Sequence, residues 1–161
     1  MTFRHFPLAI FLLFAPSILV AQARPDCALR PKSLPQMRHC YRPLMVFSPS
    51  SSDPRLKKQQ SILDNAADDM MDRFVLFLPI LIKSANYQAP LDTPYALLDA
   101  KEKAAIRNHF QIPDEQFTVL LLGEDGSVKL RSTVPVPIHR LNSLIDAMPD
   151  RKVEMRRPHA N

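Results

Sequence analysis

The sequence predicts an α/β domain in which a central mixed sheet is flanked by helices, with the element order β-α-β-α-β-β-α. Three observations predict it. Two apolar runs rich in strand-forming residues, 44–47 and 74–82, are separated by a segment with helical periodicity. An Asp-Gly pair, a strong hairpin signal, lies between the apolar run 117–122 and the alternating run 128–131. Residues 138–148 then return to helical spacing, which predicts a final helix after the hairpin.

Residues 1–23 have the composition of a secretory signal peptide. Arg4 and His5 precede an apolar core at 8–20, and the small residues of Ala21-Gln22-Ala23 follow it. This core is too short to cross a bilayer comfortably, and no stop-transfer pattern follows. We therefore expect cleavage after the last of these alanines and a periplasmic or secreted protein. A leader that is retained as an anchor is the alternative.

The charge balance gives no support for nucleic acid as a partner. The chain has 21 Lys plus Arg against 16 Asp plus Glu, and removal of the leader lowers the formal net charge from +5 to +4. No helix-turn-helix pattern, aromatic platform or Lys/Arg stripe accompanies this small excess. The remaining chain is long enough for one domain. We expect that domain at 44–149, after a proline-rich lead-in at 24–43 and before a basic tail at 150–161.

The only two cysteines, Cys27 and Cys40, lie in the lead-in. In an exported chain an isolated pair usually forms a disulfide. Closing so short a loop would add about 3 kcal/mol to the free energy of unfolding, mainly by restricting the unfolded chain. A redox role for Cys40 is the alternative, because the basic neighbours Arg38, His39 and Arg42 could lower the pKa of its thiol. A Cys/His metal site lacks the second close pair that it needs.

The first strand is predicted at 44–47, and the first helix from Asp53-Pro54 to about residue 71. Asp can cap a helix and Pro can occupy its first position. One side of this helix is apolar and comprises Leu56, Leu63, Ala66, Ala67 and Met70. The second strand is predicted at 74–82, where Pro79 should mark a bulge, a bend or an early strand end.

A polar connection at 84–92 leads to Thr93-Pro94, which repeats the cap-plus-proline start of a helix. The apolar side of this second helix comprises Tyr95, Leu98, Ala105, Ile106 and Phe110. This apolar spacing predicts a helix between the second strand and the hairpin.

The hairpin and the last helix complete the predicted fold. The strand at 117–122 is almost wholly apolar, which fits burial on both faces. Alternation in the next strand directs its apolar residues inward and Lys129 and Arg131 outward. We expect Pro149 to end the last helix. The tail at 150–161 should then be solvated and weakly ordered.

This order of elements is that of a thioredoxin-like fold. An enzyme of that fold would carry its nucleophile in the loop after the first strand, where a helix N-terminus stabilises a thiolate. The loop here, 48–53, contains serines and an aspartate but no cysteine. Serine cannot replace the thiol without a nearby base. There is also no proline immediately before Phe117, where thioredoxins place a cis-proline. Both omissions point away from thiol-disulfide chemistry.

Several motifs resemble the family catalogued as domain of unknown function 4174. In chain order they are 42–49, Gln60, Asp72-Arg73, 123–131 (GEDGSVKLR), 144–151 (LIDAMPDR) and Glu154-Met155. The resemblance covers about residues 41–156 and implies a thioredoxin-like fold without active-site cysteines. Similar domains occur in secreted sushi-repeat and extracellular-matrix proteins. The family offers no established catalytic residues, and this chain has Glu124 and Asp150 where lysine and methionine are commoner.

Basic side chains supply the candidate binding residues. Each is expected to be solvated or ion-paired, and partner or anion binding is the functional alternative for Lys129, Arg131, Arg151, Arg156 and Arg157. Asp146 and Arg151 could form a structural ion pair. Asp68, Asp69 and Asp72 gather near the end of the first predicted helix, but no matching set of oxygen ligands for a divalent cation accompanies them. We therefore expect no metal and no cofactor.

Three functions remain open. The preferred one is an exported, non-catalytic binding or adhesion-type module of the periplasm or cell envelope. The second is an enzyme, either a divergent thiol oxidoreductase or a peroxiredoxin-like protein that uses Cys40. The third is an envelope protein that binds a polyanion through Lys129, Arg131 and the tail, and it predicts steep salt dependence.

Overall fold

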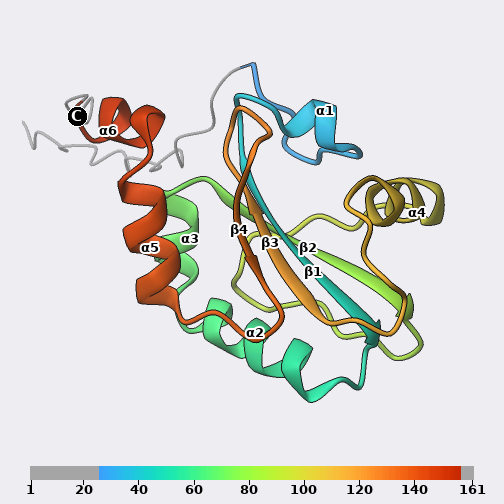
Figure 1. The fold of residues 1–161 in the computed structure, drawn as a ribbon. Coiled ribbons are helices and arrows are strands. Elements are labelled where there is room, and N and C mark those ends of the chain that lie inside the picture. Colours follow the sequence, from blue (N-terminus) through green and yellow to red (C-terminus); the bar gives the residue numbers. More distant parts are fainter. Residues whose placement is uncertain (1–25, 157–161) are drawn as a thin grey trace, which may run out of the picture.

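The computed structural model describes residues 26–156, and the predicted leader lies outside them. The sheet has four strands, and helices flank it (Figure 1). The strands are β1 (Arg42–Ser50), β2 (Val75–Lys83), β3 (Thr118–Leu122) and β4 (Val128–Ser132). The helices are α1 (Leu34–Met37), α2 (Pro54–Asp64), α3 (Ala67–Asp72), α4 (Ala100–His109), α5 (Ile138–Asp146) and α6 (Pro149–Arg156).

The sheet is mixed and has the strand order β2-β1-β3-β4. β1 and β2 pair in parallel, from Arg42 opposite Val75 to Ser50 opposite Lys83. Parallel pairing requires a crossover connection, which α2 and α3 provide. β3 is antiparallel to β1, and β4 is antiparallel to β3. The predicted α/β class, with a central mixed sheet flanked by helices, is confirmed.

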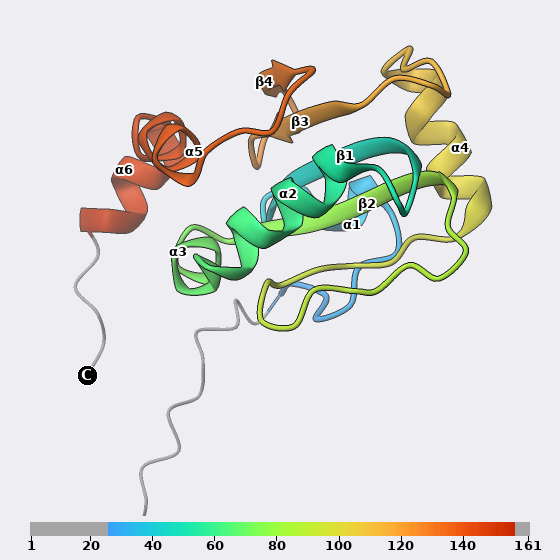
Figure 2. The same ribbon diagram turned by 90° about the horizontal axis from the view of Figure 1, so that it is seen from below.

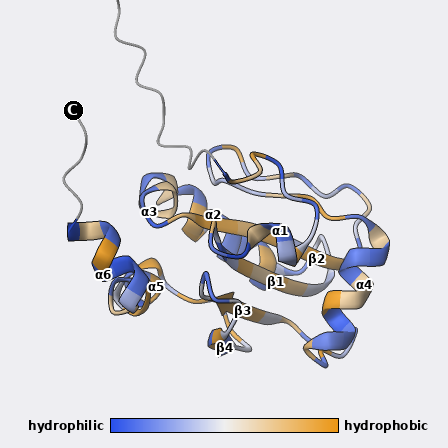
Figure 3. Ribbon diagram, turned by 90° about the horizontal axis from the view of Figure 1, so that it is seen from above, coloured by the Kyte–Doolittle hydropathy of each residue, from blue (hydrophilic) through white to orange (hydrophobic). Residues whose placement is uncertain are grey.

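Both faces of the sheet are covered, so alternate residues of each strand enter two different cores. Leu44 and Val46 of β1 pack with residues of α2, α3 and α5, whereas Met45 and Phe47 pack with residues of α1 and α4. All four side chains are fully buried, and each such burial contributes about 1.5–3 kcal/mol. Figure 2 shows α2 crossing β1 and β2, and Figure 3 shows the hydrophobic residues concentrated in the strands.

The hairpin between β3 and β4 turns at Gly126, as the Asp-Gly signal predicts. Its φ of 79° lies in a region that glycine adopts without steric cost. The N–H of Gly123 donates to the Ser127 carbonyl at 2.9 Å. The Asp125 carboxylate accepts the Ser127 backbone N–H at 2.9 Å. This hydrogen bond, together with the Lys129 ammonium, lowers the pKa of Asp125 to about 2.

Pro79 does not interrupt β2, which corrects the expectation of a bulge, bend or early end. It pairs with Val46, and β2 continues to Lys83. β2 is an edge strand, and Phe77 directs its N–H and carbonyl to the outer side, where they bond Pro94 and Ala96. Because Pro79 lies two residues further along, its nitrogen faces the same outer side and removes no bond from the ladder.

The single helix predicted from residue 53 to about 71 is wrong, because two helices occupy that span. α2 ends at Asp64 and α3 begins at Ala67. Asp and Asn favour caps and turns over helix interiors, and Asp64-Asn65 stand at the break. The Asp64 carboxylate accepts the backbone N–H and hydroxyl of Thr93 at 3.2 and 2.6 Å. This contact ties the end of α2 to the segment before α4.

The second predicted helix begins later than Thr93-Pro94. α4 starts at Ala100, where the Asp99 side chain caps it. The segment before it lies along the outer edge of β2 instead. The Phe77 N–H donates to the Pro94 carbonyl at 2.9 Å, and the Ala96 N–H donates to the Phe77 carbonyl at 3.0 Å. Residues 94–96, which the sequence pattern assigns to a helix, therefore hydrogen-bond to the open edge of β2.

The C-terminal prediction is also corrected. α5 ends at Asp146, but Pro149 begins α6, which extends to Arg156. Proline suits the first position of a helix because that position needs no N–H donor. The tail predicted as weakly ordered is thus helical to Arg156, and the remaining residues lie outside the described range. The predicted lead-in contains the short helix α1 and the first two residues of β1.

Candidate functional site

Asp53 occupies the loop after β1, where a thioredoxin-like enzyme would carry its nucleophile. Its side chain caps α2 by accepting the Arg55 backbone N–H at 2.8 Å. The Arg55 guanidinium pairs with the same carboxylate, with Nη2 2.7 Å from Oδ2. The guanidinium carbon of Arg55 lies 5.1 Å from the centre of the Phe117 ring. Since Asp53 is 6% exposed, it is a nearly buried carboxylate with its own cation.

The loop offers hydrogen-bond acceptors and hydroxyl groups. The hydrogen bond from Arg55 lowers the pKa of Asp53 below its ordinary value, although burial opposes this. An ionised carboxylate accepts hydrogen bonds and has no proton to donate. The buried Ser48 donates its hydroxyl to the Ser50 carbonyl at 3.0 Å. The loop contains no thiol and no histidine that could activate a serine, so its groups are suited to binding.

The disulfide predicted between Cys27 and Cys40 is present, with an S–S distance of 2.04 Å. It lies just before the amino end of β1, whereas Asp53 follows the carboxyl end. A strand of nine residues, roughly 30 Å long, separates the two. The Tyr41 hydroxyl donates to the Ala28 carbonyl at 2.8 Å and gives the lead-in a second attachment. The disulfide therefore fastens the lead-in at the end of the sheet opposite the Asp53 loop.

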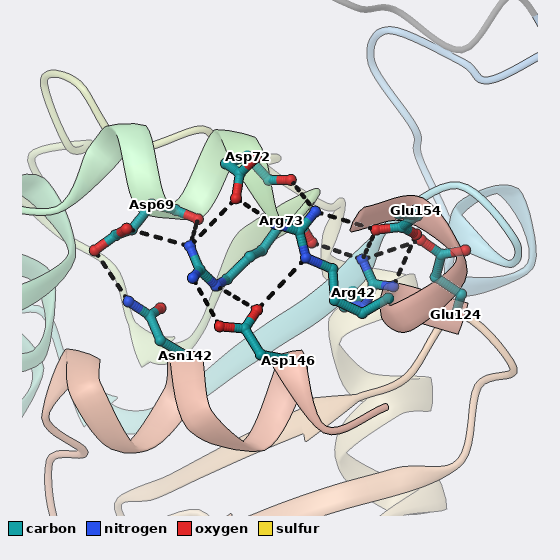
Figure 4. A network of polar contacts seen from close by, with 9 residues as sticks. Arg42, Asp69, Asp72, Arg73, Glu124, Asn142, Asp146 and Glu154 are labelled. Atoms are coloured by element: carbon teal, nitrogen blue, oxygen red, sulfur yellow. Dashed lines mark hydrogen bonds and ion pairs between the residues drawn. The ribbon is translucent and has the colours of Figure 1, made fainter. Parts of the chain in front are cut away.

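A network of ion pairs lies at the amino end of β1, and Figure 4 shows it from close by. At its centre is Arg42, whose side chain is 0% exposed. The guanidinium lies 2.9 Å from a Glu154 oxygen and 3.2 Å from a Glu124 oxygen. It also donates to the Arg73 carbonyl at 2.8 Å. Arg42 thus connects β1 to α6, to the hairpin turn and to the segment before β2.

The rest of the network joins α3, α5 and α6. Arg73 lies 2.8 Å from Asp146 and 3.2 Å from Asp69. Arg151 pairs with Asp72 and with Asp146, the latter with 3.5 Å between Nε and Oδ1. The expected ion pair of Asp146 and Arg151 is therefore confirmed. Burial acts to raise the pKa of Asp146, but hydrogen bonding and charge from Arg73 and Arg151 lower it overall.

The predicted anion-binding residues are distributed over β4 and α6. Lys129 lies 3.0 Å from a carboxylate oxygen of the hairpin turn, and Arg151 is buried in the network. Arg131 and Arg156 donate to backbone carbonyls. Arg157 lies outside the described residues. Lys129 and Arg151 are thus already paired with carboxylates of the chain itself.

Sequence reasoning missed a polar groove of about 940 Å³ beside the Asp53 loop. It lies between α2 and the segment after β2, at the carboxyl ends of β1 and β2. α2 contributes Lys57, Gln60, Ser61 and Asp64, which share one face of the helix. The other walls comprise residues 50–52, 83 and 85–88. Exposed polar residues on a helix are typical of a solvated face, so only their position identifies the groove: open α/β sheets bind ligands at the carboxyl ends of their strands.

Comparisons with known proteins agree with this architecture. The family described as "Domain of unknown function (DUF4174)" matches residues 33–154. A thioredoxin peroxidase I of Plasmodium yoelii is 16% identical, with 80% of this chain and 84% of that chain covered and a TM-score of 0.54. The reduced 2-Cys peroxiredoxin of Plasmodium vivax is 17% identical, with coverages of 74% and 84% and a TM-score of 0.55. At such identities the two structures show the fold alone, which is thioredoxin-like as predicted.

Proposed function

Because the chain belongs to the DUF4174 family and has a thioredoxin-like fold, we propose that it is an exported, non-catalytic module that binds a partner. The partner is a protein or a polyanion of the cell envelope, and an adhesion-type role fits either. The family match extends over most of the described domain, so the proposal concerns the domain as a whole.

The observation that carries this proposal is the Asp53–Arg55 pair at the start of α2. Thiol chemistry in this fold needs a thiolate at that position, where the helix N-terminus lowers the pKa of the thiol. An ion-paired carboxylate occupies the position instead. Cys27 and Cys40 are bonded to each other at the opposite end of β1. A fixed surface that binds without chemistry is consistent with both features.

Export is supported by the disulfide and by the leader-like composition of residues 1–23. Structural disulfides persist in oxidising compartments and are rare in the cytosol. Within residues 26–156, no helix combines the length and the apolar character that a membrane span requires. From the disulfide and the leader-like composition, we propose that the protein is periplasmic or secreted.

The second candidate is a thiol oxidoreductase or peroxiredoxin-like enzyme that uses Cys40. One observation favours it: the chain contains a disulfide, and two proteins of similar fold carry the names thioredoxin peroxidase and peroxiredoxin. Cys27 and Cys40 are each only partly buried, so a reductant could reach the bond. This candidate requires the bond to open and close in turnover.

Insulin reduction and peroxide consumption, each with dithiothreitol as the reductant, separate the two candidates. The matched control is the Cys27→Ser/Cys40→Ser double variant, which cannot form the bond. We expect the wild type and the double variant to give the same background rate in both assays. Turnover in the wild type that disappears in the double variant would refute the binding-module proposal and establish the enzyme.

A further inference from the structure

Hydrogen bonds between its lining segments hold the walls of the polar groove in place. The Ser51 hydroxyl donates to the Ala85 carbonyl at 2.6 Å and joins the turn after β1 to the segment after β2. The Gln60 amide nitrogen of α2 donates to the Gln88 carbonyl at 3.1 Å. The Tyr87 hydroxyl lies 3.2 Å from the Gln60 side-chain oxygen. The groove between α2 and this segment is therefore crossed by hydrogen bonds that fix its shape.

The lining chemistry suits a polyhydroxylated ligand. Most lining side chains carry hydroxyl or amide groups, which both donate and accept hydrogen bonds. The ring of Tyr87 packs against the core, and its hydroxyl reaches the Gln60 side chain at the groove wall. Single-stranded nucleic acid favours several aromatic side chains on which bases stack, whereas Tyr87 is the one aromatic residue among the described residues of this lining. A peptide favours apolar pockets for its anchor side chains.

The charges of the groove favour an anion. Lys57 and Lys83 flank it, and within residues 26–156 neither has an ion-pair partner. The one carboxylate of the lining, Asp64, is engaged by the backbone and hydroxyl of Thr93. Lys129, by contrast, already has its own carboxylate. The two lysines are thus the cations of this surface that remain available to a ligand.

We infer that this groove binds an acidic carbohydrate, with Lys57 and Lys83 contacting its carboxylate or sulfate groups and the serine and amide side chains contacting its hydroxyls. The inference rests on the proposed binding function and names a ligand class for it. Its site is at the carboxyl ends of β1 and β2, where ligands of open α/β sheets bind.

Binding of a short oligogalacturonate to the purified protein, measured by isothermal titration calorimetry at low ionic strength, tests the inference. The Lys57→Gln/Lys83→Gln variant is compared with Lys58→Gln/Lys101→Gln, which removes the same charge from exposed lysines outside the groove. Exposed charge contacts are individually weak, so we expect about fivefold weakening in the groove variant and less than about twofold in the control. Neutral dextran of similar length should bind more weakly than oligogalacturonate, and dextran sulfate should compete for the site.

Amide chemical shifts locate the site independently of affinity. Oligogalacturonate should move the resonances of residues 50–52 and 83–88 and leave those of α6 unchanged. Equal weakening in both double variants, equal binding of neutral dextran, or no binding of any of these sugars would each overturn the inference. Such failure leaves the proposed function standing, because the insulin and peroxide assays decide that question separately.

Discussion

Arg42 is the residue on which the polar contacts at the amino end of the sheet converge. It is fully buried and faces Glu124 and Glu154, both of which are largely buried as well. A buried ion pair adds little net stability over an apolar replacement of both partners, but removing one partner leaves uncompensated charge. The contact between Arg42 and Glu154 also joins residues 112 positions apart in the sequence.

Replacing Arg42 with methionine tests the importance of this residue. Arg42→Met retains an apolar stem but removes the cation from two carboxylates, so we expect the free energy of unfolding to fall by about 3–5 kcal/mol. Urea denaturation measures the change. The control Arg156→Met alters an exposed arginine of α6 and should change stability by less than about 0.5 kcal/mol. Equal effects of the two substitutions would contradict the role assigned to Arg42.

The lowered pKa of Asp53 predicts a specific dependence of stability on pH. The folded protein lowers the pKa of this carboxyl below the ordinary value of 3.8. Its ionised form therefore stabilises the fold above pH 3.8, and that contribution is lost as the pH falls through the lowered pKa. Asp53→Asn keeps a capping side chain but never ionises.

Urea midpoints of the wild type and Asp53→Asn, measured from neutral pH into acid, provide the test. The wild type should be the more stable at neutral pH, and the difference should disappear in acid. Asp125 and Asp146, whose pKa values are also lowered, are present in both proteins and add the same slope to each. A difference that stays constant with pH would show that the charge of Asp53 does not stabilise the fold.

The sequence does not reveal the partners of these residues. Arg42 stands at the start of an apolar strand, and nothing in its neighbourhood distinguishes a buried arginine from a solvated one. Its partners come from the hairpin turn and from α6, and only the folded chain brings them together. The Cys27–Cys40 pair could be predicted, because a chain with only two cysteines offers one intramolecular pairing.

At the scale of elements, the disulfide is the covalent attachment of the lead-in, beside the hydrogen bond from Tyr41. α1 has four residues, too few to be stable alone. We expect the Cys27→Ser/Cys40→Ser variant to lose about 3 kcal/mol of unfolding free energy while its sheet remains folded. Hydrogen exchange should accelerate at residues 34–41 far more than in β1 and β3. Acceleration spread evenly over the whole chain would contradict a local role of the disulfide.

Periodicity predicts the type of most elements and fails at their ends. Continuous apolar runs predict β1, β2 and β3 because both faces of the sheet are covered. Alternation in β4 correctly predicts the burial of Leu130 but not the position of Val128, which is 49% exposed. The helix starts at Thr93-Pro94 and the stop at Pro149 are misread for a physical reason. The open edge of β2 captures the Pro94 segment, and proline suits the first turn of α6 as well as it suits the end of α5. Local signals of this kind have two meanings, and tertiary contacts decide between them.

At the scale of the whole molecule, structural contacts lie at one end of β1 and the candidate binding surface lies at the other. The amino end carries the disulfide and the ion pairs that fasten the lead-in and α6 to the sheet. The carboxyl end carries the Asp53 loop and the polar groove. The predicted thioredoxin-like fold places a functional surface at the carboxyl end, but the groove itself could not be predicted, because its walls come from separate segments whose polar residues are ordinary surface residues in sequence.

The state of the two cysteines in the native protein tests this division most directly. The protein is purified from cells that express the full chain and treated with an alkylating reagent, without and then with reductant, and its mass is measured. We expect a chain that begins at Arg24, takes up no reagent before reduction, and takes up two equivalents after reduction of the single disulfide. Rapid alkylation of Cys40 in the native protein, together with turnover that is lost in Cys40→Ser, would contradict the account and assign the function to a redox-active thiol at the amino end.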